Sequence, residues 1–270
     1  MADGFHGIAA LVTGASKGLG RAYALELARR GARVILVARS EGDLRRVAGE
    51  IGERTDAPPA VVISVDLAAS DGSQRVVREI RSRGLTVDLL VNNAGAGSAG
   101  PFLSRPLEPQ LTTVDLNVTG LLALSHAFAE QMVARGSGGI INVSSGAAFQ
   151  PMPYQAVYAA TKALVLSFTE ALAEELRGTG VHVMAAHPGA VATGFFDGTS
   201  ATIDPAADAP EVVASRTLDD YARRRAASYP GRFTTRAMTW PARLLPRTAV
   251  TRLSGAFNRR QGLHEVVDLG

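Results

Sequence analysis

The fold is decided by the stretch Ile8-Ala9-Ala10-Leu11-Val12-Thr13-Gly14-Ala15-Ser16-Lys17-Gly18-Leu19-Gly20. Its first five residues are continuously apolar, which is typical of a parallel strand that is covered on both faces. The glycines that follow are spaced G-x-x-x-G-x-G, so the backbone can turn tightly into a helix predicted from about Arg21 to Arg30. Such a turn can place a pyrophosphate on the helix N-terminus, although a glycine cluster can also be a tight turn without a ligand.

Short β-branched runs alternate with helical patterns over the first 190 residues. Strands are predicted at residues 8–12, 34–37, 61–65, 89–91, 140–143 and 181–186, and the helices after the first at about 44–51, 74–82, 109–135 and 154–177. This alternation predicts one α/β domain over residues 1–270, a Rossmann-like doubly wound parallel sheet with helices on both faces. Ligands of such sheets bind at the carboxyl ends of the strands.

The pattern changes after Thr193. Residues 194–230 are predicted to form a substrate loop or lid, with a helix from about Leu218 to Ser228 and a last strand near Arg232-Phe233-Thr234. Residues 236–262 are predicted to form a basic C-terminal helical extension, which Pro241 and Pro246 interrupt.

Composition excludes several classes of protein. The 270 residues are 46% hydrophobic and include no Cys, which argues against disorder, disulfide scaffolds and zinc–thiolate sites. The five His are scattered, so no metal site is expected. No apolar run of 18 residues and no N-terminal secretion signal are found, and a cytoplasmic location is therefore predicted.

Charge is unevenly distributed along the chain. Residues 216–270 carry 11 Arg and four acidic residues, a net charge of +7, whereas residues 1–215 carry 17 basic and 21 acidic residues, a net charge of −4. The basic segment is either a solvated helix face or a surface for an anionic partner, a lipid surface included, and no nucleic-acid partner is expected. Of all 28 basic residues only Lys17 and Lys162 are lysines, and both lie inside motifs.

The residues at the end of the second predicted strand indicate whether the cofactor is NADH or NADPH. An acidic residue at that place would bond the ribose 2′-hydroxyl of NAD, whereas an Arg suits a 2′-phosphate. The strand ends in Val37-Ala38-Arg39-Ser40 without an acid. Arg39, with Lys17 from the glycine turn, therefore favours NADPH as the cofactor, although Arg39 could also be an ordinary surface residue.

Tyr158 and Lys162 lie four residues apart, on one face of a predicted helix. An ammonium beside a phenol favours the phenolate, so Lys162 is expected to lower the pKa of Tyr158, as general acid–base catalysis requires. Ser145, at the end of a predicted strand, could bond a substrate oxygen. Taken alone, a Tyr-x-x-x-Lys pair is most often a pair of surface side chains.

Together these motifs make the chain resemble a short-chain dehydrogenase/reductase of the roughly 250-residue kind. The resemblance rests on the glycine turn and on Asn92-Asn93-Ala94-Gly95, Asn117, Ser144-Ser145, Tyr158-Ala159-Ala160-Thr161-Lys162 and Pro188-Gly189-Ala190-Val191-Ala192-Thr193, which occur in family order. The C-terminal part is loosely similar to 3-oxoacyl-thioester and 17β-hydroxysteroid reductases.

The resemblance implies a role for each matching residue. Tyr158 would donate a proton to the substrate carbonyl, Lys162 would tune Tyr158 and bond the nicotinamide ribose, Ser145 would hold the carbonyl oxygen, and Asn117 would maintain a helix bulge with an ordered water. The cofactor would contact Gly14, Ser16, Lys17, Gly18, Leu19, Gly20, Arg39, Ser40, Asp66, Leu67, Asn93, Ala94, Gly95, Tyr158, Lys162, Pro188, Gly189, Val191 and Thr193. Asp66 could instead cap the following helix, and Ser144 and Asn92 could serve buried backbone or side chains.

The substrate pocket is expected to contain Phe149, Met152, Phe195 and Phe196, although these residues could equally belong to the core. We therefore expect an NADPH-dependent reductase of an apolar ketone or 3-oxoacyl-type substrate, in a homodimer or homotetramer by family resemblance. The alternatives are an alcohol or hydroxysteroid dehydrogenase working in the oxidising direction and a non-catalytic NADP(H)-binding regulator. A sugar-nucleotide epimerase is disfavoured by the small region after Thr193.

Overall fold

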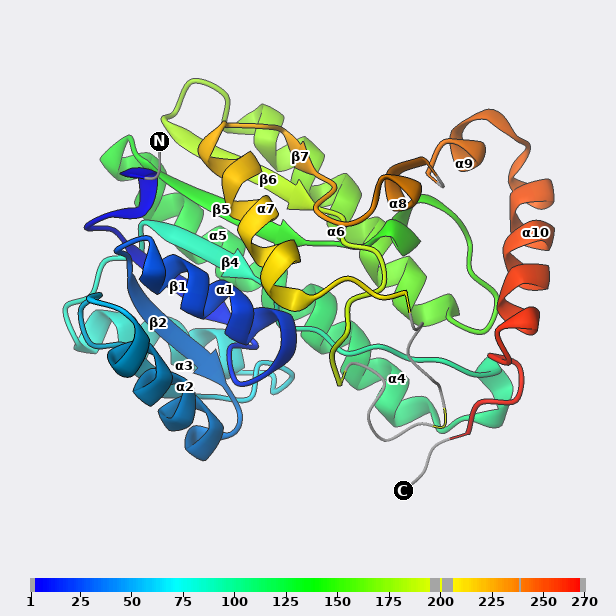
Figure 1. Cartoon of the computed structure of the whole chain (residues 1–270), viewed down its shortest axis with the longest axis horizontal. Coiled ribbons are helices and arrows are strands. Elements are labelled where there is room, and N and C mark those ends of the chain that lie inside the picture. The colour runs from blue at the N-terminus through cyan, green and yellow to red at the C-terminus, as the bar shows by residue number, and fades with distance from the viewer. Residues whose placement is uncertain (1–2, 195–199, 201–205, 238, 268–270) are drawn as a thin grey trace.

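The computed structural model describes residues 3–194, 200, 206–237 and 239–267. Its centre is a seven-stranded sheet in the order β3-β2-β1-β4-β5-β6-β7, in which all neighbouring strands are parallel (Figure 1). The strands are β1 (Ala9–Thr13), β2 (Arg33–Ala38), β3 (Val61–Ser64), β4 (Leu89–Asn92), β5 (Gly138–Val143), β6 (Val181–Ala186) and β7 (Ala227–Ser228). The strand order reverses direction between β1 and β4, so their carboxyl ends form the crevice in which such sheets bind ligands.

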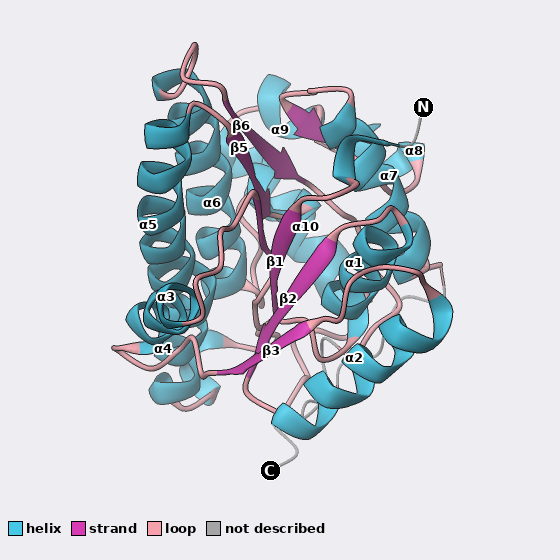
Figure 2. Ribbon diagram, turned by 90° about the vertical axis from the view of Figure 1, so that its left-hand side faces the viewer, coloured by secondary structure: helices cyan, strands magenta, loops and turns pink. Residues whose placement is uncertain are grey.

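Helices cover both faces of the sheet (Figure 2). One face carries α1 (Gly18–Arg29), α2 (Glu41–Arg54) and α7 (Pro210–Ala222), and the other carries α3 (Gly72–Ser82), α5 (Gly120–Arg135) and α6 (Ala156–Glu175). Successive strand residues point to opposite faces, so in β1 Val12 belongs to the first core and Leu11 to the second. Both cores are apolar, which is why the strands are apolar at every position, and the predicted doubly wound sheet is confirmed.

One predicted helix is divided in the structure. The segment predicted as a helix from 109 to 135 consists of α4 (Leu107–Val114), a π-helical turn (Asp115–Thr119) and α5. A π turn holds one residue more than an α turn, and such turns are frequent at functional sites. It contains Asn117, the residue for which a helix bulge is expected, so that expectation is confirmed.

Two predictions in the C-terminal part are wrong. The helix predicted from Leu218 to Ser228 is α7, which begins at Pro210 and ends at Ala222. Proline is well suited to a first helical position, because that position needs no amide donor. The last strand is β7, paired with β6 at Ala227 and Ser228, whereas residues 233 and 234 belong to α8 (Phe233–Ala237). Thus α7 and β7, although inside the predicted loop of residues 194–230, are part of the folded body.

The C-terminal extension is helical, with the predicted proline interruptions. It continues with α9 (Pro241–Leu244) and α10 (Arg247–Arg260). Short 3-10 helices occupy Asp3–Phe5, Phe102–Ser104 and Gly146–Phe149. Within the described residues, α6 is the one helix that is long and apolar enough to cross a membrane by length and composition. In this fold α6 packs against β6, and its inward side buries Lys162.

Candidate active site

The carboxyl ends of β1 and β4 are joined by one side chain, Thr13. Its hydroxyl accepts hydrogen bonds from the backbone amides of Asn93 (3.0 Å) and Ala94 (2.9 Å) and donates to the Val91 carbonyl (3.4 Å). The Asn93 amide group donates in turn to the Thr13 carbonyl (3.0 Å). These bonds position the loop after β4 beside the glycine turn, so two predicted cofactor segments lie together.

The glycine turn is shaped so that only glycine fits at its key positions. Gly14 and Gly18 have φ angles of +67° and +55°, which L side chains rarely adopt. A Cβ on Gly20 would lie 2.1 Å from the Gly14 carbonyl oxygen, so any side chain there would displace the turn. The first turn of α1 carries no acidic residue. A close backbone approach beside the N-terminus of a helix fits the pyrophosphate of a dinucleotide.

Three basic side chains lie around this glycine turn. Lys17 and Arg39 are both exposed, and Arg46 of α2 donates to the Ser16 carbonyl (3.3 Å). Nothing in the sequence marks Arg46, because only the packing of α2 beside the turn brings it there. The Ser40 hydroxyl, also predicted to contact the cofactor, accepts from the Asp43 amide (3.3 Å) and caps α2.

After β3, Asp66 and Leu67 lead away from the sheet. One Asp66 carboxylate oxygen accepts from the Ala68 amide (2.9 Å), so this carboxylate caps a turn, while α3 begins only at Gly72. Leu67 is buried in the core between the sheet and α5. Their predicted contact with the cofactor stays a prediction.

The three predicted catalytic side chains gather at the end of β5. Ser145 follows this strand, and its side chain hydrogen-bonds Tyr158 from α6. The ammonium of Lys162 lies 5.9 Å from the centre of the Tyr158 ring and donates to the Val143 carbonyl (2.8 Å). The Ser144 hydroxyl donates to the Lys162 carbonyl (2.9 Å), which gives Ser144 the structural role that the sequence allowed. A hydroxyl from the end of β5 thus lies beside a phenol and an ammonium from α6.

Burial shifts the pKa values of both Tyr158 and Lys162, and for Tyr158 the shift is opposite to the one expected from the sequence. Desolvation raises the pKa of Tyr158, and the hydrogen bond with Ser145 opposes that rise without reversing it. The predicted lowering of the Tyr158 pKa by Lys162 is therefore not found. Burial acts on Lys162 in the opposite sense and lowers its pKa from 10.5 to about 8. Near neutral pH the phenol is protonated and can donate a proton.

Asn117 connects three segments from inside the π turn. Its side-chain oxygen accepts from the Ala96 amide (2.8 Å), and its side-chain nitrogen donates to the Ala96 carbonyl (3.0 Å) and to Thr161 Oγ1 (3.1 Å). A Cβ on Gly95 would lie 3.1 Å from the Asn117 oxygen and 3.5 Å from the Lys162 nitrogen. Gly95 therefore leaves room for these two side chains, and both lie beside it. Thr161, which the sequence analysis did not select as a site residue, is the α6 partner of Asn117.

The segment from Pro188 to Thr193 closes the crevice on the other side. The Pro188 carbonyl accepts from the Gly146 amide (2.9 Å), and Val191 forms a parallel bridge with Asp208. The Thr193 side chain lies against Gly18, where a Cβ would come within 3.1 Å of it. This contact brings another predicted cofactor segment next to the glycine turn.

An aromatic cluster lies on the substrate side. The Phe149 ring lies 5.0 Å from His187 and 6.1 Å from Tyr229, and the Arg236 guanidinium lies 5.4 Å above the Tyr229 ring. Neither His187 nor Tyr229 could be assigned here from spacing, because β6 and the residues after β7 meet only in the fold. Met152 lies in the loop 151–154, whereas Phe195 and Phe196 lie outside the described residues.

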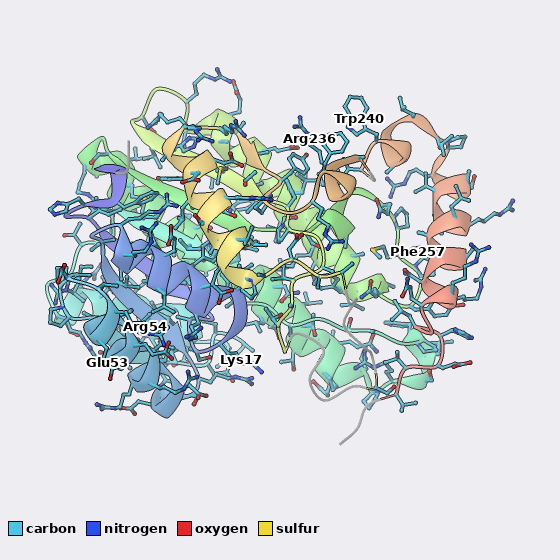
Figure 3. All side chains as sticks on the ribbon, in the orientation of Figure 1. Lys17, Glu53, Arg54, Arg236, Trp240 and Phe257 are labelled. Carbon is cyan, nitrogen blue, oxygen red and sulfur yellow. The ribbon has the colours of Figure 1, made fainter. Side chains whose placement is uncertain are left out.

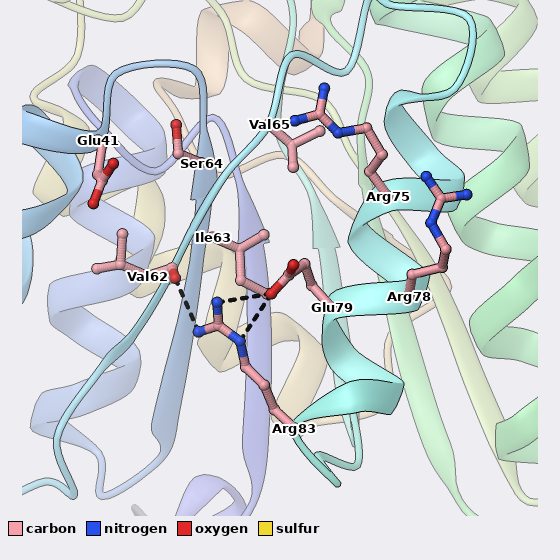
Figure 4. Close-up of a pocket in the computed structure, with 9 residues that line it drawn as sticks. All are labelled: Glu41, Val62, Ile63, Ser64, Val65, Arg75, Arg78, Glu79 and Arg83. Atoms are coloured by element: carbon pink, nitrogen blue, oxygen red, sulfur yellow. Dashed lines mark hydrogen bonds and ion pairs between the residues drawn. The ribbon is translucent and has the colours of Figure 1, made fainter.

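A separate hollow at the sheet edge is not part of this site. The cavity of about 330 Å³ lies between β3 and α3, and Arg83 there donates to the Val62 carbonyl (3.2 Å) and to Glu79 (Figure 4). Arg83 thereby covers an unpaired carbonyl of an edge strand, which protects the sheet from pairing with another chain. No group of three or more His, Asp or Glu that could hold a metal occurs in the described part of the chain.

Comparison with known proteins assigns the family. The family profile described as short chain dehydrogenase matches residues 8–204. The chain is 36% identical to a 3-oxoacyl-[acyl-carrier-protein] reductase of Synechocystis sp., covering 71% of this chain and 77% of the relative. It is 35% identical to the human 17-beta-hydroxysteroid dehydrogenase type 3, covering 68% of this chain and 59% of the relative. A short chain dehydrogenase of Pseudocercospora fijiensis is 37% identical, and the match spans 60% of its length.

Solved structures show the same fold over nearly the whole chain. A short-chain dehydrogenase from Sphingobium yanoikuyae in complex with NADPH has a TM-score of 0.78 at 30% identity and covers 96% of this chain and 95% of its own. The L-sorbose reductase of Gluconobacter frateurii, in complex with NADPH and L-sorbose, has a TM-score of 0.74 at 28% identity and covers 85% of this chain and 96% of its own.

Proposed function

The chain belongs to the short-chain dehydrogenase family, and from this premise we propose that it is an NADPH-dependent carbonyl reductase acting on an apolar ketone or 3-oxoacyl-type substrate. The observation that carries the proposal is the meeting of Ser145, Tyr158 and Lys162 at the end of β5, with Asn117 close to Lys162. Such a set of polar groups fits a carbonyl whose oxygen gains charge during reduction.

Each of the three side chains would have its own role in carbonyl reduction. A bound NADPH would supply the hydride for the carbonyl carbon. The Ser145 hydroxyl would hold the carbonyl oxygen, and the Tyr158 hydroxyl, protonated at neutral pH, would transfer its proton to that oxygen as the alkoxide forms. The Lys162 ammonium beside the ring would stabilise the phenolate that remains, and solvent would return the proton to Tyr158.

We propose NADPH over NADH because the adenosine side of the glycine turn is basic. Arg39 follows β2 at the position where an acid would select the 2′-hydroxyl, and Lys17 stands in the turn itself. The complexes of the Sphingobium and Gluconobacter relatives with NADPH support this choice. Titration with both cofactors tests it: NADPH should bind more tightly, and Arg39→Ala should remove most of that preference. Equal binding of NADH by the unchanged protein would overturn the NADPH assignment.

An apolar substrate is supported by the stacked rings of Phe149 and Tyr229, because Phe149 ends the short helix that begins directly after Ser145. Tyr158→Phe tests catalysis directly, because it removes the proton donor and retains the ring. The variant should bind NADPH with unchanged affinity and lose turnover on a panel of ketones by about 10²–10⁴-fold. Full turnover in this variant would refute Tyr158 as the donor, and an unaltered biological effect without turnover would indicate a nucleotide-binding regulator.

We also propose that two copies associate through the helices beside the site, as family resemblance leads us to expect, and that the protein works in the cytoplasm. Exposed apolar side chains on these helices support the first proposal: Leu111 of α4, Val133 of α5 and Leu164 of α6 are 46%, 39% and 42% exposed. Sedimentation should show a dimer or tetramer that Leu164→Glu dissociates. A monomer at all concentrations would contradict this arrangement.

A further inference from the structure

The C-terminal helices carry a one-sided charge that the reductase chemistry does not use. Between residues 221 and 264 the sequence contains ten Arg and no Asp or Glu. Six of these arginines lie in α8, α9 and α10, whereas Arg225 and Arg232 lie outside these helices and pair with Asp220 and Asp208. The three helices lie at the end of the molecule opposite α2 (Figure 1). Described arginines of this segment that are exposed include Arg236, Arg247, Arg252 and Arg260. With no carboxylate in this stretch, the helices present cationic side chains to any anionic surface.

Large apolar side chains are exposed among these arginines. The exposed fractions are 81% for Phe233, 55% for Trp240, 75% for Leu244, 61% for Leu253 and 48% for Phe257. The Trp240 ring projects from the outline of the molecule (Figure 3). A soluble protein rarely leaves so many large apolar residues exposed within 25 residues unless they meet a partner.

The attachment of α10 leaves two of its large apolar side chains exposed. Ser254 donates to the Pro151 carbonyl (2.6 Å), and Asn258 donates to the Pro153 carbonyl (2.7 Å). Phe257 lies two turns after the buried Val250, at the border of the attached face, and Leu253 lies one turn before Phe257. Small and polar residues thus fix α10 to the loop 151–154, and the larger apolar residues remain for another contact.

We propose that α8, α9 and α10 form a docking surface for an anionic lipid bilayer, called here the C-terminal surface. Arginine together with Trp, Phe and Leu is the composition of elements that lie in the membrane interface, where the cations meet phosphate headgroups and the apolar side chains enter the acyl boundary. An acidic protein would satisfy the charge but would leave the apolar side chains unexplained. The proposal does not depend on the proposed activity.

The C-terminal surface is connected to the residues of the expected substrate pocket. Arg236 of α8 lies on Tyr229, which stacks with Phe149, and α10 is fixed to the loop that contains Met152. A bilayer on the C-terminal surface would therefore lie next to the expected substrate pocket. An apolar substrate could then reach the crevice from the lipid phase.

Trp240 is the single tryptophan of the chain and provides an internal probe. We would titrate the full-length protein with vesicles of phosphatidylcholine alone and with vesicles that also contain phosphatidylglycerol, and record Trp240 emission and co-sedimentation. The emission should shift to shorter wavelength with the anionic vesicles at about 0.01 M salt. The shift should be lost at about 1 M salt, because the screening length falls from about 30 Å to about 3 Å.

Two sets of charge variants locate the contact. Arg247→Gln, Arg252→Gln and Arg260→Gln together should weaken partitioning into anionic vesicles by about 100-fold, since each arginine near a charged bilayer contributes about fivefold. The matched control replaces three exposed arginines of α2 and α3 at the other end of the molecule, Arg45, Arg78 and Arg81. The control variant should bind within about twofold of the unchanged protein.

Apolar variants complete the test. Leu244→Ser with Leu253→Ser should weaken vesicle binding by about tenfold or more without affecting the fold, because both side chains are mostly exposed. Unchanged emission with anionic vesicles at low salt would overturn the proposal. Equal losses in the two arginine variants would also overturn it, as would a concentration-dependent emission shift without lipid, which would identify a second copy as the partner.

Discussion

Replacing Lys162 by Met is expected to change how the stability of the protein depends on pH. Burial lowers the pKa of Lys162 from 10.5 to about 8, so the folded protein releases this proton more readily than the unfolded chain. Between pH 8 and pH 10.5 the unfolded state binds more protons, and folding stability contributed by this site rises with pH. Below pH 8 the desolvation penalty on the ammonium is fully present, and the two pKa values correspond to a penalty of ~3 kcal/mol.

The methionine variant lacks this proton and keeps a buried chain of similar length. The free energy of unfolding of the unchanged protein, minus that of Lys162→Met, should therefore increase by about 2 kcal/mol between about pH 7 and about pH 9.5. Losing the hydrogen bond to the Val143 carbonyl lowers the free energy of unfolding of the variant by an amount that is nearly the same at each pH. Urea unfolding at several pH values measures the difference. Lys17→Met is the matched control, because it removes an ammonium from an exposed position.

The reasoning would be refuted if the unchanged protein and Lys162→Met kept a constant difference across this pH range. The comparison should be repeated in a Tyr158→Phe background, because the phenol lies beside the ammonium and could titrate differently once the charge is gone. The same increase in that background would assign the effect to Lys162 alone. Its disappearance there would assign it to the coupled pair.

Three further predictions follow from the glycine turn and the protonation of the site. Thr13→Val should destabilise the fold by about 2–4 kcal/mol in urea unfolding, because two amides of the loop after β4 lose their acceptor, whereas Thr13→Ser should retain most of the stability. Gly20→Ala should abolish NADPH binding in calorimetry, because the Cβ would lie 2.1 Å from the Gly14 carbonyl oxygen, whereas Gly49→Ala, with nothing within 4 Å in α2, should raise stability by up to about 1 kcal/mol. The rate of ketone reduction should fall as pH rises through about 8, where Lys162 loses its charge, and a flat profile from pH 7 to 9 would contradict this role.

Much of the architecture is local in origin and could be predicted. Each of the first six strands is a short apolar run, and the first five are each followed by a helical pattern, because both faces of a parallel sheet must be covered. The turn from Thr13 to Gly20 was recognisable because a positive φ and a close backbone approach demand glycine at particular positions. The bulge at Asn117 came from family resemblance, since nothing in its local sequence indicates a π turn.

The C-terminal half was less predictable, because its elements depend on partners far along the chain. The two residues of β7 form a strand only because Ala185 and Ala186 of β6 offer them an edge. The helix α7 begins earlier than predicted, at Pro210, and it is held by packing on α1, with a hydrogen bond of 3.0 Å between Tyr23 and Thr217. Short strands and helices with an irregular pattern are decided by such tertiary contacts rather than by propensity.

The sequence by itself determined which chemical groups this protein has: the glycine turn, the basic residues after β2, and the hydroxyl, phenol and ammonium of Ser145, Tyr158 and Lys162. Only the tertiary structure decided how these groups behave. It raises the pKa of Tyr158, which the spacing to Lys162 was expected to lower, and it brings Tyr229 against Phe149. The physical reason is that desolvation and packing depend on what surrounds a group in space, whereas the sequence records only what stands next to it along the chain.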